Sequence, residues 1–245
     1  MKSKWHIIRK RIDYDLAGSP EQYYFSPAFY AQYCAVMPLI QRYVKGKAID
    51  LGCGFMPFRG YIADRVTVYH TLDLYPHSSD ITFVGDIQNM SMIPAATYDS
   101  ALCLEVLEHI PYPLLALREI YRILKPGGVL VLSVPYLSRI HDQPYDYSRF
   151  TIYGLRLMLT ESGFNVLEIV PKGGLLSFIG HQVSSFLLVL TWPKRRVRQI
   201  VWFFNKWAIT RLWYQIDKLI GKWDIFPLGY VGVAQKPVNR EDLAK

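Results

Sequence analysis

The chain has 245 residues, a formal net charge of +8 and a sequence pI near 9.3. This length can bury the core of one α/β domain with an appendage, and the positive charge indicates an anionic partner or surface. Cys34, Cys53 and Cys103 are odd in number and lie in apolar stretches, which excludes a disulfide framework and a cysteine metal site and suits a reducing compartment. The charged N-terminus has no continuous apolar stretch, so we expect no secretory signal.

We expect residues 1–45 to form an N-terminal helical segment. Its first 18 residues are basic and predict no regular structure, whereas Ser26-Pro27 is typical of a helix start. This helix should run toward Val44 and bend at Pro38.

Residues 46–172 and 228–236 alternate short β-like runs with helical periodicity, which indicates a parallel sheet with helices on both faces. The pair Gly127-Gly128 should end the helix before the fifth strand. We expect strands at residues 46–51, 66–72, 80–84, 98–104, 127–134, 164–170 and 230–234, and helices at 112–124 and 151–162.

Residues 173–227 break this alternation and form a hydrophobic, basic insert before the last strand. The insert holds eight basic and two acidic residues, so +6 of the net +8 lies there, and it holds five of the six tryptophans. These residues are Lys194, Arg195, Arg196, Arg198, Lys206, Arg211, Lys218 and Lys222, with Trp192, Trp202, Trp207, Trp213 and Trp223.

The most informative motif is Asp50-Leu51-Gly52-Cys53-Gly54, an acid and a Gly-x-Gly turn at the end of an apolar strand. Such a turn lets backbone N–H groups approach a nucleoside-bearing ligand closely. Asp73 ends the next strand about twenty residues on, as ribose recognition requires. Pro57 replaces the third glycine that a dinucleotide would need, so the motif indicates a nucleoside cofactor without a pyrophosphate.

Further motifs follow in order: Gly85-Asp86, Tyr98-Asp99-Ser100, Glu105 to His109, and Leu124 to Gly128 before a strand. With this series, residues 45–172 and 228–236 resemble the class I S-adenosylmethionine-dependent methyltransferases. The resemblance implies a Rossmann-like α/β fold with a seven-stranded, mostly parallel sheet, helices on both faces and a helical insert before the last strand. It also implies S-adenosyl-L-methionine as the cofactor.

The resemblance assigns roles to the cofactor residues. Asp50 would lie near the methionyl amine, Asp73 would accept from both ribose hydroxyls, and Asp86 would accept from the adenine amino group. Either of the last two acids would alternatively cap a helix. The implied cofactor-binding residues are Asp50, Gly52, Gly54, Asp73, Leu74, Asp86, Ile87, Leu104 and His109.

Glu105, Glu108 and His109 would share one face if a helix begins at the end of the fourth strand. In the interpretation that we adopt, Glu105 borders the methyl-transfer site and balances the sulfonium, and no metal is bound. Alternatively, the three residues and His141 hold a divalent metal, as in some quinone-pathway and small-RNA methyltransferases. A third possibility is that the acids only complement a helix dipole.

The loop at residues 135–151 follows the fifth strand, where open α/β sheets bind ligands. It is similar to a His-x-x-Pro-x-Asp-aromatic-x-Arg-aromatic-Thr signature in a branch of methyltransferases associated with cell-envelope glycans. His141 is the candidate general base, and Arg149 would orient a phosphate or carboxylate of the acceptor. Alternatively, Asp146 and Arg149 form an ion pair that braces the loop.

Aromatic and cationic residues alternate along the insert after an apolar stretch at 175–192. This composition is typical of a segment in the headgroup layer of an anionic membrane. A lid or homodimer interface is a second interpretation, and a nucleic-acid surface is disfavoured by the apolar stretch.

Together these patterns predict a methyltransferase with His141, Glu105 and Arg149 as catalytic residues. It would dock peripherally on the cytoplasmic face of a membrane through residues 175–225 and O-methylate a saccharide or lipid-linked amphipathic acceptor. The alternatives are a quinone-type or other small-molecule O-methyltransferase, with or without a divalent metal, and a non-catalytic membrane-associated protein with a vestigial fold.

Overall fold

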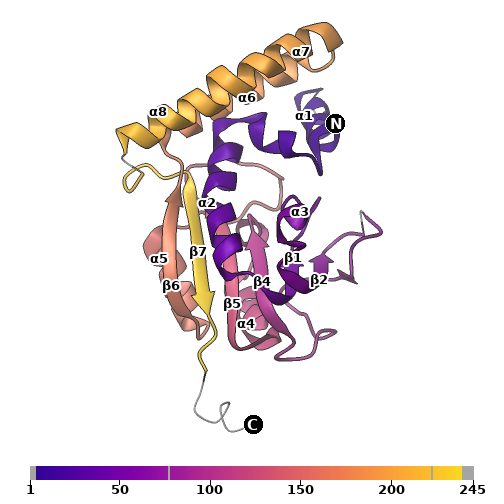
Figure 1. The fold of residues 1–245 in the computed structure, drawn as a ribbon, viewed down its shortest axis with the longest axis vertical. Coiled ribbons are helices and arrows are strands. Elements are labelled where there is room, and N and C mark those ends of the chain that lie inside the picture. Colours follow the sequence, from indigo (N-terminus) through magenta and orange to yellow (C-terminus); the bar gives the residue numbers. More distant parts are fainter. Residues whose placement is uncertain (1–3, 77, 222, 239–245) are drawn as a thin grey trace. The chain divides into compact units, whose positions relative to one another are not determined.

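The computed structural model describes residues 4–76, 78–221 and 223–238, so Lys222 and the first three residues lie outside the described chain. The chain divides into two compact units (Figure 1). Residues 36–170 and 229–245 form the sheet unit, and residues 1–35 and 171–228 form the helical unit. Most of the N-terminal segment and the insert, which the sequence treats separately, therefore belong to the same unit.

The sheet has seven strands in the order β3-β2-β1-β4-β5-β7-β6. β1 pairs in parallel with β2 and β4, β2 with β3, and β4 with β5, whereas β7 runs antiparallel to β5. The predicted fold class is therefore confirmed. The strands are β1 (Gly46–Leu51), β2 (Val66–Asp73), β3 (Phe83–Val84), β4 (Tyr98–Leu104), β5 (Leu124–Pro135), β6 (Asn165–Lys172) and β7 (Gly229–Gln235).

Helices α4 (Pro113–Ile123) and α5 (Ile152–Glu161) pack on the sheet through their apolar faces. Leu117 and Ile120 of α4 and Leu155 of α5 are fully buried in the same core cluster as residues of β4 and β5. Thr151 Oγ1 accepts a hydrogen bond from the Gly154 amide at 3.1 Å, which confirms the predicted helix cap. Figure 1 shows both helices behind the sheet, with the second half of α2 (Pro27–Tyr43) in front and the short α3 (Arg59–Ile62) nearby.

The prediction that Gly127-Gly128 ends α4 is wrong, because α4 ends at Ile123 and β5 begins at the next residue. The register of β5 against β4 shifts between the pairs made by Tyr98 and Ser100. Gly127 has a φ of +79°, and a Cβ on Gly128 would lie 2.8 Å from a backbone oxygen. The two glycines therefore permit an irregularity inside the strand.

The prediction that residues 1–18 are irregular is also wrong, because α1 (Lys4–Leu16) is helical. Ile8, Ile12 and Leu16 recur every four residues and pack with Leu188 and Trp192 in a core of the helical unit. The other helices of this unit are η1 (Pro20–Phe25), α6 (Leu175–Thr191), α7 (Arg195–Phe204), the π-helix η3 (Asn205–Arg211) and α8 (Leu212–Ile220).

Most tryptophans of the insert are held inside the helical unit. Trp192 is 5% exposed and donates a hydrogen bond to Asp15 at 2.8 Å. Trp202 and Trp223 are partly buried and donate to Glu21 and to the Asp217 carbonyl. Trp207, in contrast, is 49% exposed. Within the described ranges, no helix combines the length and apolarity needed to cross a membrane.

Candidate active site

The carboxyl ends of β1 and β2 bring together the glycines and acids of the predicted cofactor loop. The Gly54 amide donates to Asp73 Oδ2 at 3.0 Å, and the Gly52 amide donates to the Leu72 carbonyl at 2.8 Å. Gly52 has a φ of +65°, and a Cβ there would lie 2.5 Å from Val106 Cγ2. Glycine is required at this position, because the turn is left-handed and the side chain of Val106 fills the space.

Asp50 is buried inside the sheet unit, with 4% of its surface exposed. Its Oδ2 accepts a 2.6 Å hydrogen bond from the Tyr69 hydroxyl of β2. Burial raises the pKa of Asp50 to about 7; the Tyr69 hydrogen bond opposes this shift, and the nearby Asp73 carboxylate adds to it. A ligand cation placed beside Asp50 would favour the charged form, so this carboxyl suits an ammonium group.

The predicted adenine contacts lie on the turn after β3. The Gly85 amide donates to the Asp73 carbonyl at 3.0 Å, which places this turn next to the end of β2. Asp86 is exposed, and its Oδ1 accepts from the Gln88 amide at 2.8 Å, so it closes a local turn. Ile87 is 4% exposed and belongs to the core cluster.

Leu74 follows Asp73 and is 54% exposed. The contacts of Leu74, Asp86 and Ile87 with a cofactor stay predictions.

The segment after β4 does not form the expected helical face. Leu104 is the last strand residue, Glu105 has a φ of +57°, and only the short 3₁₀ turn η2 (Leu107–His109) follows. The positive φ turns the chain before η2 starts, so Glu105 does not share a helix face with Glu108 and His109. Glu108 is fully buried, whereas Glu105 is half-buried at the carboxyl end of β4.

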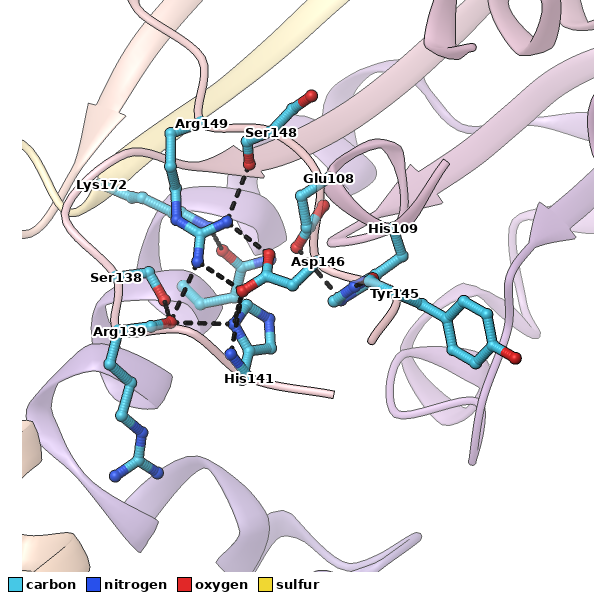
Figure 2. A network of polar contacts seen from close by, with 11 residues as sticks. Glu108, His109, Ser138, Arg139, His141, Tyr145, Asp146, Ser148, Arg149 and Lys172 are labelled. Carbon is cyan, nitrogen blue, oxygen red and sulfur yellow. Dashed lines mark hydrogen bonds and ion pairs between the residues drawn. The ribbon is translucent and has the colours of Figure 1, made fainter. Parts of the chain in front are cut away.

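His109 and His141 lie edge to face, with ring centroids 4.8 Å apart (Figure 2). His109 Nδ1 lies 2.6 Å from the Tyr145 carbonyl oxygen, and His141 Nδ1 lies 3.1 Å from the Arg139 carbonyl oxygen. A carbonyl oxygen can only accept, so both Nδ1 atoms carry the proton. The lone pair of each neutral ring is therefore on Nε2, the atom that can take a proton or bind a metal.

Asp146 orients His141 from the same loop. Its Oδ2 accepts from the His141 amide at 2.9 Å and lies 3.5 Å from Nδ1 of the ring. Arg149 makes two hydrogen bonds to Asp146, at 2.6 and 2.8 Å, and these hold the pKa of the Asp146 carboxyl far below its usual range. An ionised carboxylate with a buried side chain therefore lies on the Nδ1 side of the His141 ring, which leaves Nε2 as the ring atom that can meet an acceptor.

Arg149 is engaged inside the loop. Besides Asp146, its guanidinium donates to the Arg139 carbonyl at 3.0 Å and to the Ser148 carbonyl at 2.8 Å (Figure 2). These contacts are those of the alternative interpretation, in which the Asp146–Arg149 pair braces the loop. Acceptor orientation by Arg149 stays a prediction.

A hollow of about 250 Å³ opens at this loop. Its walls are mixed, with the Ile140 and Tyr147 side chains beside serine hydroxyls and the Asp146–Arg149 pair, and it shares Asp146 with the His141 arrangement. The lining residues are Ser138, Ile140, Asp146, Tyr147, Ser148 and Arg149.

Glu108, His109 and His141 each offer one ligand atom, and these atoms lie within 4.8 Å of one another. One carboxylate and two imidazoles suit a divalent transition metal. The carbonyl contacts of both Nδ1 atoms leave Nε2 as the free ligand atom of each ring, and His109 Nε2 lies 3.7 Å from Glu108 Oε1.

Sequence reasoning missed Tyr69 and the orienting role of Asp146. Tyr69 reaches Asp50 across β1 and β2, and no sequence pattern reveals a pair set by strand register. For Asp146, the signal was present, because it lies five residues after His141 in the recognised signature.

A mostly parallel seven-stranded sheet with an antiparallel β7, and an acid with a Gly-x-Gly turn at the carboxyl end of β1, are typical of the class I methyltransferase architecture. Residues 28–217 match the methyltransferase domain family, and the chain belongs to it. The chain therefore carries a methyltransferase domain, and the cofactor of such a domain is S-adenosylmethionine.

The chain is similar to the ubiquinone biosynthesis O-methyltransferase of Pseudomonas aeruginosa, with 33% identity over 140 residues, covering 52% of this chain and 54% of the relative. Matched proteins of the same name in Xanthomonas campestris are covered over 42% of their length. The chain thus spans about half the length, or less, of these curated relatives.

Among solved structures, the [4+2]-cyclase SpnF is similar with a TM-score of 0.56 and 19% identity, covering 83% of this chain and 80% of that one. A S-adenosylmethionine-dependent methyltransferase of Mesorhizobium loti gives a TM-score of 0.53 and 15% identity, covering 84% and 97%. At these identities the likeness shows the shared fold.

Proposed function

We propose that the protein O-methylates an amphipathic acceptor that carries a free hydroxyl, at the cytoplasmic face of a membrane. The observation that carries the proposal is the His141 arrangement. Its Nδ1 proton is fixed by the Arg139 carbonyl and Asp146, and Asp146 also lines a hollow of about 250 Å³ in the same loop. The names of the curated relatives also support a hydroxyl acceptor.

Each residue of the candidate site has a proposed role in methyl transfer. When bound, S-adenosylmethionine supplies an activated methyl group on a positively charged sulfur, which keeps the electron pair of the broken bond as the acceptor oxygen takes the methyl. His141 Nε2 takes the hydroxyl proton, and the Asp146 carboxylate stabilises the imidazolium that forms. Asp50, Gly52, Gly54 and Asp73 would hold the cofactor. Glu105 would face its positive charge, and correct positioning supplies most of the rate.

Two acceptor classes fit. The loop signature favours a saccharide hydroxyl, including a lipid-linked one, whereas the names of the relatives favour a quinone-type phenol. A divalent metal on Glu108, His109 and His141 would favour the phenol, because a metal lowers the pKa of a hydroxyl bound to it. In that case His141 would be a ligand and would not act as the base.

To test the proposal, the protein is incubated with methyl-labelled S-adenosylmethionine and either a polyprenyl catechol or a lipid-linked saccharide fraction. The transfer of label is measured with and without a chelator. His141→Gln should lower turnover by about 100-fold or more while cofactor affinity holds. His6→Gln, in α1 of the helical unit, is the matched control. Undiminished turnover in His141→Gln would remove the proposed base, and activity lost to chelator and restored by one metal would assign the metal site.

A further inference from the structure

The helices α7, η3 and α8 follow one another without a break from Arg195 to Ile220 and leave a row of large apolar side chains in solvent. Ile200 is 73% exposed, Phe203 68% and Leu219 85%. The exposed row comprises Ile200, Phe203, Phe204, Trp207, Leu212, Ile216 and Leu219, which we call the apolar stripe.

The π-helix aligns the two halves of the stripe. At about 100° per residue, Ile200, Phe203 and Trp207 fall within about 60° of one another on α7 and the start of η3. In an unbroken α-helix, Leu212 and Leu219 would then lie about 100–120° away from Ile200. A π turn takes one extra residue, which removes about 100° and returns Leu212 and Leu219 to within about 20° of Ile200.

Burial on the opposite face supports this phase. The run has buried side chains both before and after the extra residue of the π turn: Asn205, Ile209, Thr210, Tyr214 and Asp217. Asn205 Nδ2 donates to the Phe25 carbonyl at 3.0 Å, and Asp217 accepts from the Gly174 amide at 2.6 Å. These contacts lie within the helical unit and anchor the inner face of the run, so the stripe is its outer face.

The charge beside the stripe is positive. Residues 195–220 hold six basic side chains and one acidic side chain, and that acid, Asp217, is buried. Lys206, Arg211 and Lys218 follow one flank of the stripe by the same angular count. Lys206 is paired with Glu21 at 2.6 Å and the Arg211 guanidinium lies 4.1 Å from the Trp207 ring centroid, whereas Lys218 and the residues Arg195 and Arg196 at the start of α7 are exposed. An apolar row with a cationic flank complements the headgroup layer of an anionic bilayer.

We propose that the apolar stripe is the surface by which this protein docks on an anionic lipid bilayer, with the α7–η3–α8 run lying in the plane of the membrane. The inference rests on the proposed function, in which the acceptor resides in that bilayer, and names the face that binds it. From composition, the tryptophans and basic residues of the insert together are expected to contact the membrane. The proposed docking face instead uses Ile, Leu and Phe side chains with Trp207, because Trp192 lies in the core of the helical unit.

The test is flotation of the full-length protein with vesicles of phosphatidylcholine alone or with 30% phosphatidylglycerol. We expect the wild type to float with the anionic vesicles only, and to be released by high salt. Ile200→Glu/Leu219→Glu should lower the bound fraction about tenfold or more, since both side chains would enter the bilayer. Leu157→Glu on α5, 58% exposed in the sheet unit, is the matched control and should float like the wild type.

Flotation of the double variant like the wild type, or no flotation of the wild type, would overturn the proposal. A wild-type dimer that the double variant converts to monomer, without flotation of either, would assign the stripe to self-association instead. Methyl transfer to a water-soluble hydroxyl acceptor separates the two proposals. It should persist in the double variant, and its absence from a wild type that still floats would contradict the proposed function alone.

Discussion

The raised pKa of Asp50 makes proton release on cofactor binding a quantitative prediction. In the free protein the pKa of this carboxyl is about 7, chiefly because of burial. At pH 6.0 about 90% of the molecules should carry the proton, and at pH 7.0 about half. If the ammonium group of S-adenosylmethionine lies beside Asp50, binding favours the carboxylate, so about 0.9 proton should leave at pH 6.0.

Calorimetry in two buffers of different ionisation enthalpy measures this number directly. If only the carboxylate form binds, the affinity should rise about fivefold from pH 6.0 to 7.0. Asp50→Asn cannot release the proton and should abolish both effects. No release by the wild type at pH 6.0, or equal release by Asp50→Asn, would refute the placement of Asp50 at the amine.

The same pKa fixes the sign of a stability effect. Between about pH 4 and pH 7 the folded state holds the Asp50 proton and the unfolded state does not, so stability falls as the pH rises through this window. Urea unfolding at pH 5 and pH 8 should therefore show a larger loss for the wild type than for Asp50→Asn.

Three further variants test the cofactor loop and the helical unit. Asp73→Ala should weaken cofactor binding about 100-fold by calorimetry, because the two charge-assisted hydrogen bonds that we assign to ribose would be lost. Asp80→Ala, at an exposed position, should leave the affinity unchanged, and equal affinities of the two variants would remove the ribose assignment. Gly52→Ala should lower the free energy of unfolding by at least about 1–2 kcal/mol, from its φ of +65° and the contact with Val106; an unchanged urea midpoint would contradict the required turn. Asp217→Ala should lower the free energy of unfolding by about 2–3 kcal/mol, because three backbone amides at the start of α6 lose their hydrogen-bond acceptor. If the free energy of unfolding falls no more than in Asp224→Ala, at an exposed position, Asp217 does not anchor this helix.

The fold was predictable from sequence because its signals are local. The strand before Asp50, the cap at Thr151 and the alternation of strands with helices each depend on a few neighbouring residues. The wrong assignments of residues 1–18 and of Gly127-Gly128 have the opposite cause. Residues 4–16 form a helix because Ile12 packs against Leu188 and Trp192, which are distant in sequence. Gly127 and Gly128 lie inside a strand because β5 pairs with β4 on both sides of them.

The candidate site divides in the same way. Gly52, Gly54 and Asp73 could be chosen from sequence, because the chemistry of a tight turn and a strand-end acid restricts the residue types. Tyr69 and the fixed Nδ1 protons of His109 and His141 depend on partners at distances that only the folded chain sets. The face of the insert depends on one extra residue in η3, which hydrophobic periodicity alone does not reveal.

The central claim is methyl transfer to a hydroxyl of an amphipathic acceptor, and the most direct measurement is the fate of the label from methyl-labelled S-adenosylmethionine. Purified protein is incubated with a fractionated lysate, and the products are separated into organic, aqueous and nucleic-acid phases. The account predicts label in the organic phase, as a methyl ether, and its loss with His141→Gln. Label confined to the nucleic-acid or aqueous phase, or no label despite measurable cofactor binding, would contradict the account.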